Sequence, residues 1–114
     1  MDGMEQYLLL QKKMEMLDIA LREAKSRGLE FAQAEQEYQI AKNKTVLILR
    51  SEDTPATLIQ LMVKGEKEVA EKMIKRDIAK VLYESANEAI NVYKLEIKVL
   101  QSNIDREWNN VERI

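Results

Sequence analysis

Apolar residues recur at helical spacing along two long stretches of this 114-residue chain, and a short segment with helix breakers separates them near the midpoint. In the first stretch, from about residue 4 to residue 51, the apolar positions follow at steps of three and four, the pattern of a helix packed along another helix. The stripe comprises Tyr7, Leu10, Met14, Leu17, Leu21, Ala24, Gly28, Phe31, Ala34, Tyr38, Ala41, Thr45 and Ile48. Two successive steps of three after Gly28 predict a stammer, a local overwinding of the coil.

Gly28 admits two interpretations. Glycine costs about 1 kcal/mol relative to alanine inside a helix, so the helix either breaks here or continues, with a bend or a close neighbour at the glycine. No proline or second breaker accompanies Gly28, which favours one continuous helix over residues 4–51.

The midpoint segment, EDTPATLIQLMVKG at 52–65, holds the only proline of the chain. Thr54 is expected to cap a short helix over residues 55–64, with Pro55 at its first position and Gly65 as the residue that ends it. The apolar side of this helix is expected to be Leu58, Ile59, Leu61 and Met62. The segment therefore predicts a corner between two long helices.

The second stretch, from residue 66 to about residue 111, has a regular heptad pattern. One seam position holds Tyr83, Ile90, Ile97, Ile104 and Val111, and the other holds Ala79, Ala86, Tyr93 and Leu100. A second apolar stripe lies beside this seam and comprises Ile78, Leu82, Ala89, Val92 and Val99. The apolar face is therefore wider than one neighbouring helix can cover.

These elements predict an all-α fold, a long antiparallel helical hairpin with coiled-coil-like packing and a short connector helix, as a single domain over residues 1–114. Glycine and proline together number only four, whereas average usage is about 12% of a chain. A bare hairpin buries one stripe per helix and has a marginal core. The second stripe therefore predicts a homodimer in the form of a four-helix bundle, with a heteromeric partner and a larger assembly as alternatives.

The residue types present offer little for catalysis. The chain has neither histidine nor cysteine, so it lacks the usual general base and the usual soft metal ligands. Glu30, Glu35 and Glu37 are expected on a solvated helix face, and the tyrosines at seam spacing are expected in the core. We therefore predict no catalytic residue, no metal site and no cofactor, and a protein that is not an enzyme.

The expected location is the cytoplasm, without a membrane segment. The first residues carry acids where a signal peptide needs basic residues. The longest apolar run has about four residues, against the roughly 18 that a membrane span needs.

Charge leaves nucleic acid as an alternative partner. The net charge is −2, but residues 42–80 carry nine basic and six acidic side chains. Contacts to phosphate would come from Lys72, Lys75, Arg76 and Lys80. No aromatic residues are interleaved with them as a base-stacking surface requires, and a solvated helix with ion pairs explains the same residues.

The only tryptophan, Trp108, lies one residue off the seam near the C-terminus. It either covers the open end of the bundle or anchors a protein partner, since tryptophan is frequent at interaction hot spots.

Residues 54–108 carry Lys-Arg-Asp at 75–77 and Asn-Glu-Ala-Ile-Asn at 87–91 ahead of Trp108. In this pattern the chain resembles small, helix-rich, uncharacterised proteins encoded by phages and prophages of Gram-positive bacteria. The resemblance covers about half of the chain and concerns helices, not a catalytic site. It implies a phage-encoded accessory protein without a defined activity.

Together these observations predict a non-enzymatic structural or protein-interaction protein that dimerises and engages an unknown protein partner. Two alternatives remain. The first is an accessory protein that contacts nucleic acid through its basic connector end, and the second is an inhibitor of a host enzyme.

Overall fold

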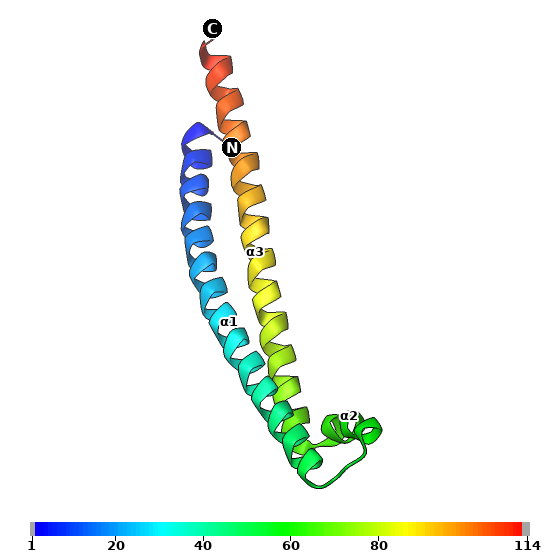
Figure 1. The fold of residues 1–114 in the computed structure, drawn as a ribbon. Helices are drawn as coiled ribbons and strands as arrows, with labels where there is room; N and C mark the ends of the chain where they lie inside the picture. Colours follow the sequence, from blue (N-terminus) through cyan, green and yellow to red (C-terminus); the bar gives the residue numbers. More distant parts are fainter. Residues whose placement is uncertain (1, 113–114) are drawn as a thin grey trace. The chain divides into compact units, whose positions relative to one another are not determined.

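The computed structural model describes residues 2–112 as three helices joined by two short connections (Figure 1). Helix α1 runs over Gly3–Ser51, α2 over Ala56–Gly65 and α3 over Lys67–Glu112. No strand occurs among the residues described, and the predicted all-α helical hairpin is confirmed. The continuous helix favoured through Gly28 is present, since α1 crosses that residue without a break.

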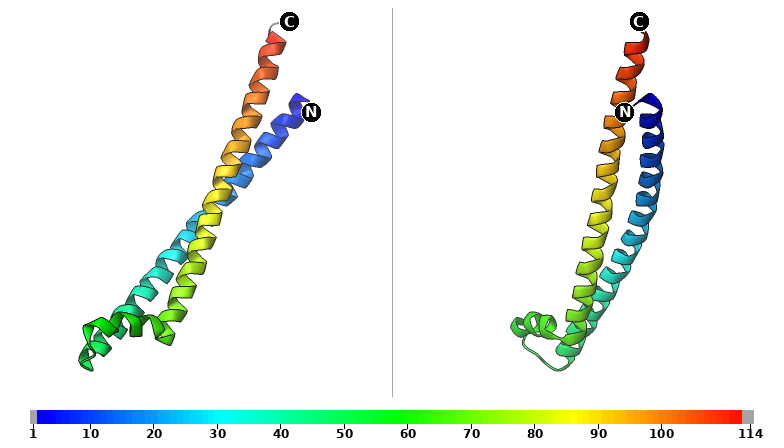
Figure 2. Two further views of the ribbon diagram at one scale, coloured as in Figure 1. Left: turned by 90° about the vertical axis from the view of Figure 1, so that its right-hand side faces the viewer. Right: turned by 180° about the vertical axis from the view of Figure 1, so that it is seen from behind.

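The chain divides into two compact units. We call the residues up to Lys25, together with those from Glu84 onward, the terminal unit, and residues 26–83 the connector unit. In each unit a segment of α1 lies beside an antiparallel segment of α3, and α2 belongs to the connector unit (Figures 1 and 2). The connector unit is thus a helical hairpin by itself, and the expectation of a single domain over the whole chain stays a prediction.

The core of the connector unit forms where its three helices meet. Ala41 and Leu49 of α1, Ile59 and Val63 of α2, and Val69 of α3 are all buried in one cluster. Burial of an aliphatic side chain of this size stabilises the fold by about 1.5–3 kcal/mol. These contacts hold the short α2 against the two long helices.

The buried face of α2 differs from the predicted one. Of Leu58, Ile59, Leu61 and Met62, only Ile59 is buried, and Val63 is its buried neighbour one helical turn later. Leu58, Leu61 and Met62 are 47, 68 and 48% exposed. Because α2 is apolar on both of its faces, hydrophobicity alone did not indicate which face would be covered.

The end of α1 has the geometry of a Schellman motif. The amide of Thr54 donates to the carbonyl of Leu49, and the amide of Asp53 donates to the carbonyl of Arg50, both at 3.1 Å. Asp53 adopts the left-handed conformation with φ of 58°, which Asp tolerates better than most residues. The chain therefore leaves α1 through Asp53.

The predicted ends of α2 are each wrong by one residue. Pro55, not Thr54, is the N-cap, and Gly65 is the last helical residue instead of the residue after the helix. Glu66 follows with extended backbone, and its carboxylate accepts a hydrogen bond from the amide of Val69 at 3.0 Å. The carboxylate of Glu66 thus caps the first turn of α3. The connection between α2 and α3 therefore forms without a glycine in the left-handed conformation.

The buried side of α1 also corrects the sequence pattern. Tyr7, Met14 and Leu21 were predicted in the seam but are exposed. The buried and half-buried positions include Gln6, Leu10, Lys13, Leu17, Ala20, Ala24, Arg27, Phe31, Ala34, Tyr38, Ala41 and Thr45. Gly28 is half-buried and Leu49 is buried on the same side of the helix, so the burial pattern does not decide between the two registers, and the stammer after Gly28 stays a prediction. Gln6, Lys13 and Arg27 are among these positions, and a pattern of apolar residues alone could not indicate that they face α3.

The seam of α3 is confirmed as predicted. Ile90 is buried and the remaining seam residues within the described part are half-buried. Those residues are Ala79, Tyr83, Ala86, Tyr93, Ile97, Leu100 and Ile104. The side chain of Val111 lies outside the part that the structure describes.

Candidate interaction surface

In the connector unit, α3 presents a continuous apolar patch to solvent. Ile74, Ile78, Val81 and Leu82 are 56, 57, 60 and 40% exposed, and we call these four residues the α3 patch. They line a hollow of about 330 Å³ together with Asp77. The sequence pattern identified Ile78 and Leu82 but missed Ile74 and Val81. Ile74 lies four residues before Ile78 and Val81 lies three residues after it, so both share its face of the helix.

A second hollow lies beside the α3 patch, between α3 and α1. It has a volume of about 340 Å³, and Ile78 and Leu82 form part of its apolar wall. Its polar lining includes Glu30, Glu37 and Lys75. The patch is therefore bordered on this side by charges of both signs.

In the terminal unit, the predicted second stripe is also uncovered in the single chain. Val92 and Val99 are exposed, as is Leu95, which the sequence pattern missed, whereas Ala89 is half-buried. Val99 and Leu95 border a groove of about 380 Å³ that is also lined by Lys13 of α1. Of the five residues predicted to form a dimer interface, Ile78, Leu82, Val92 and Val99 are thus exposed and Ala89 is half-buried.

Ion pairs between α1 and α3 flank the α3 patch. The Glu37 carboxylate of α1 receives Nζ of Lys72 at 3.2 Å and Nζ of Lys75 at 3.0 Å. The hydrogen bonds from Lys75 and Lys72 lower the pKa of Glu37 below its ordinary value. These contacts tie α1 to α3 within the connector unit.

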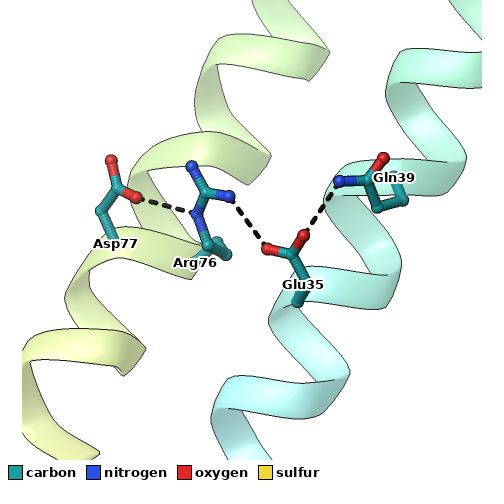
Figure 3. Close-up of polar contacts among 4 residues, drawn as sticks. All are labelled: Glu35, Gln39, Arg76 and Asp77. Atoms are coloured by element: carbon teal, nitrogen blue, oxygen red, sulfur yellow. Dashed lines mark hydrogen bonds and ion pairs between the residues drawn. The ribbon is translucent and has the colours of Figure 1, made fainter. Parts of the chain in front are cut away.

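Arg76 forms the second link between the same helices. Its guanidinium lies between Asp77 of α3 and Glu35 of α1 (Figure 3). The N–O distances are 2.8 Å to Asp77 and 2.9 Å to Glu35. The side-chain amide of Gln39 donates to the other carboxylate oxygen of Glu35 at 2.9 Å. Hydrogen bonds from Gln39 and Arg76 lower the pKa of Glu35, and Glu35 raises the pKa of Arg76. The guanidinium also lies over the ring of Tyr38, 4.6 Å from its centroid.

These pairs change the interpretation of two sets of residues. The side chains of Glu35 and Glu37 are 37 and 42% exposed, so the expected solvated face is partly right, but both carboxylates also bind cations of the opposite helix. Lys72, Lys75 and Arg76, three of the four candidate phosphate contacts, are the cations they bind. The fourth, Lys80, is exposed. A phosphate would therefore compete with carboxylates for three of the four side chains.

Trp108 is 64% exposed in the terminal unit. It lines a shallow hollow of about 330 Å³ with Gly3, Tyr7, Ile104 and Glu107. A large exposed aromatic side chain beside a hollow is compatible with both roles expected for Trp108. It can cover the open end of the helical bundle or anchor a protein partner.

The described residues form neither a metal-binding cluster nor a membrane-spanning helix. No three acidic side chains among residues 2–112 lie close enough together to hold a metal ion. No helix in that part of the chain has both the length and the apolar character needed to cross a bilayer.

Comparison of the chain with protein-family models, with curated proteins and with solved structures finds no match. No residue role is therefore carried over from another protein. The candidate surface rests on the exposure, contacts and charges of the residues described above.

Proposed function

We propose that the protein is a non-enzymatic interaction protein that functions as a homodimer of helical hairpins. The observation that carries this proposal is the uncovered apolar side of α3. Ile78, Leu82, Val92 and Val99 are 57, 40, 47 and 52% exposed, although the opposite side of the same helix is packed. Exposed apolar side chains that recur along one side of a helix are typical of an interface, and a second copy is the partner always present with the chain.

The charges and the residue types support the same proposal. The cations Lys72, Lys75 and Arg76 serve contacts inside the chain, which favours an apolar protein surface over a phosphate-binding one. The resemblance of residues 54–108 to phage and prophage proteins supports a role as a phage-encoded accessory protein, for which the homodimer would be the functional form.

Sedimentation velocity of the wild-type protein, Leu82→Glu and Val92→Glu tests the proposal. We expect the wild type to sediment at twice the 13.3 kDa chain mass. Both variants are expected to sediment at the mass of one chain or to lose helicity, because a carboxylate buried against apolar side chains without a partner is strongly unfavourable.

The matched control is Leu61→Glu, which places the same charge at a residue that is 68% exposed and belongs to α2 instead of α3. It should leave the mass and the circular dichroism unchanged. Wild-type protein that sediments as a single chain across the micromolar range would contradict the proposal, as would full helicity and a dimeric mass in both α3 variants.

A further inference from the structure

A hollow of about 210 Å³ lies in the connector unit, and all three helices contribute to its lining. Val63 of α2 and Val69 of α3, which are 2 and 3% exposed, line it and belong to the buried cluster of this unit. Ala70, which is half-buried, and Met73 add apolar wall from α3. The hollow therefore extends to the core of the connector unit, where an aliphatic group is favourably buried.

The polar side chains that line the same hollow are cationic or neutral. Lys42 of α1 and Lys64 of α2 are the cations, Tyr38 contributes a phenol and Gln60 an amide. No acidic side chain of the described residues is part of the lining. An apolar hollow with a few convergent polar groups is the usual composition of a site for a small ligand, and the charge of this lining favours an anion.

Neither lysine binds a carboxylate of the chain. Within residues 2–112, Lys42 and Lys64 form no hydrogen bond or ion pair with an oxygen. The ammonium of Lys42 lies 5.5 Å from the centroid of the Tyr38 ring, a contact that leaves its N–H groups without an oxygen acceptor. Lys42 acts on Glu35 through space, but both carboxylate oxygens of Glu35 already accept hydrogen bonds (Figure 3). Both lysines thus have donors available for an acceptor from outside the chain.

We propose that this hollow binds a small aliphatic carboxylate. The hydrocarbon tail lies against Val63, Val69 and Ala70, and the carboxylate accepts charge-assisted hydrogen bonds from the ammonium groups of Lys42 and Lys64. The volume is below the roughly 300–1,000 Å³ of sites for drug-sized ligands, so the tail is short. Phosphate has no apolar part and would leave the aliphatic wall in contact with water.

The proposed site goes beyond the homodimer and does not depend on it, because no residue of the α3 patch lines this hollow. A bound carboxylate would link α1 to α2, since Lys42 belongs to the first helix and Lys64 to the second. Binding to the folded state alone stabilises that state. The ligand should therefore raise the thermal midpoint of the protein.

Titration of the isotope-labelled full-length protein with hexanoate tests the site, with two-dimensional NMR as the readout. We expect saturable shifts of the amides of Val63, Lys64 and Ala70, while those of Ile78 and Leu82 in the α3 patch stay in place. Butanoate should bind more weakly, by about fourfold for each methylene removed. Hexanol, which has the tail without the charge, and phosphate, which has charge without a tail, should each bind at least roughly tenfold more weakly than hexanoate.

Four variants locate the ligand. Lys42→Met and Lys64→Met each remove one cation and keep a long side chain, and each should weaken hexanoate binding by about tenfold or more. Lys44→Met is the matched control, because Lys44 is an exposed residue of α1 that does not line the hollow, and it should bind as the wild type does. Ala70→Leu fills the hollow and should abolish binding while both lysines remain. Circular dichroism checks the fold of each variant, and the lysine variants decide the test if Ala70→Leu does not fold.

Three results would overturn the inference. The first is the absence of saturable shifts at Val63, Lys64 and Ala70. The second is equal binding of butanoate and hexanoate, or equal weakening in Lys44→Met and Lys42→Met, which would show ion pairing at the surface only. The third is hexanol binding as tight as that of hexanoate, which would show an apolar hollow without selection for an anion. None of these results bears on the mass of the protein in sedimentation, so the proposed homodimer is tested separately.

Discussion

The ring of Tyr83 lies close to the backbone of α1 at Gly28. A Cβ atom at position 28 would lie 3.1 Å from Cε1 of Tyr83, closer than ordinary carbon contacts of about 3.5–4.0 Å. Tyr83 also packs on Phe31, with ring centroids 6.1 Å apart. The glycine therefore permits a close neighbour, which is one of the two consequences expected for a continuous helix.

A double-mutant cycle tests this account of Gly28. Gly28→Ala alone should change the free energy of unfolding little, because a gain of about 1 kcal/mol in helix propensity is offset by displacement of the Tyr83 ring. In the background of Tyr83→Val, the same substitution should stabilise the protein by about 1 kcal/mol, since the obstacle is gone. Urea denaturation at one protein concentration measures both effects, and equal effects in the two backgrounds would show that the ring does not constrain position 28.

At the scale of elements, charged side chains connect α1 to α3 in the connector unit. Glu35 and Glu37 of α1 hold Arg76, Lys72 and Lys75 of α3 through contacts of 2.9–3.2 Å. Pairs as exposed as these contribute modestly to stability. Their positions nevertheless favour one alignment of the two helices, because a shift along the seam would break them together.

These contacts predict a dependence of stability on pH. The pKa values of Glu35 and Glu37 are lowered in the folded chain, whereas glutamate in an unfolded chain has a pKa of about 4.3. The stabilisation is thus complete above about pH 4.3 and is lost as the pH falls through the lower folded values. We expect the thermal midpoint to fall between about pH 5 and pH 3.

The variant Glu37→Gln isolates this contribution. It should lower the thermal midpoint at pH 7 and reduce the fall of the midpoint in acid, because the variant has no carboxylate to protonate at that position. Glu88→Gln, on the exposed surface of α3 outside the ion-pair cluster, is the control and should follow the wild type. Identical pH profiles for wild type and Glu37→Gln would show that the pairs of Glu37 do not contribute to stability.

The seams of the two long helices differed in how well they could be predicted. On α3, isoleucine, alanine and tyrosine occupy the seam at regular intervals, and the buried positions match the sequence pattern. On α1, Gln6, Lys13 and Arg27 occupy seam positions. Lys13 reaches Glu96 of α3 at 2.5 Å in the terminal unit, a contact that no pattern within α1 indicates. A long polar side chain can thus lie in a seam when a partner receives its charge.

At the scale of the whole molecule, association would link stability to concentration. Binding that occurs only in the folded state stabilises that state by mass action. We therefore expect the thermal midpoint of the wild type to rise with protein concentration, while that of a folded Leu82→Glu variant stays constant. Circular dichroism melts over a hundredfold range of concentration measure this, and a constant wild-type midpoint would indicate that dimerisation contributes nothing to folding.

Local chemistry was sufficient to predict the helices. A chain with few glycines and one proline forms long helices, and the breakers around Pro55 interrupt them because they act on the adjacent backbone. The strict heptad of α3 likewise identified its buried side, since a seam of apolar residues needs no knowledge of the partner. The uncovered stripe with Ile78 and Leu82 followed from the same periodicity.

Only the tertiary structure decided which side chains meet. The side of α2 that faces the core, the polar seam positions of α1 and the carboxylates that bind Arg76 and Lys75 all depend on contacts between residues far apart in the chain. Helical periodicity orders side chains around one axis, but it carries no information about the rotation and shift of the neighbouring axis. That relation arises when the helices pack, and it determines which charges are paired and which apolar residues stay exposed.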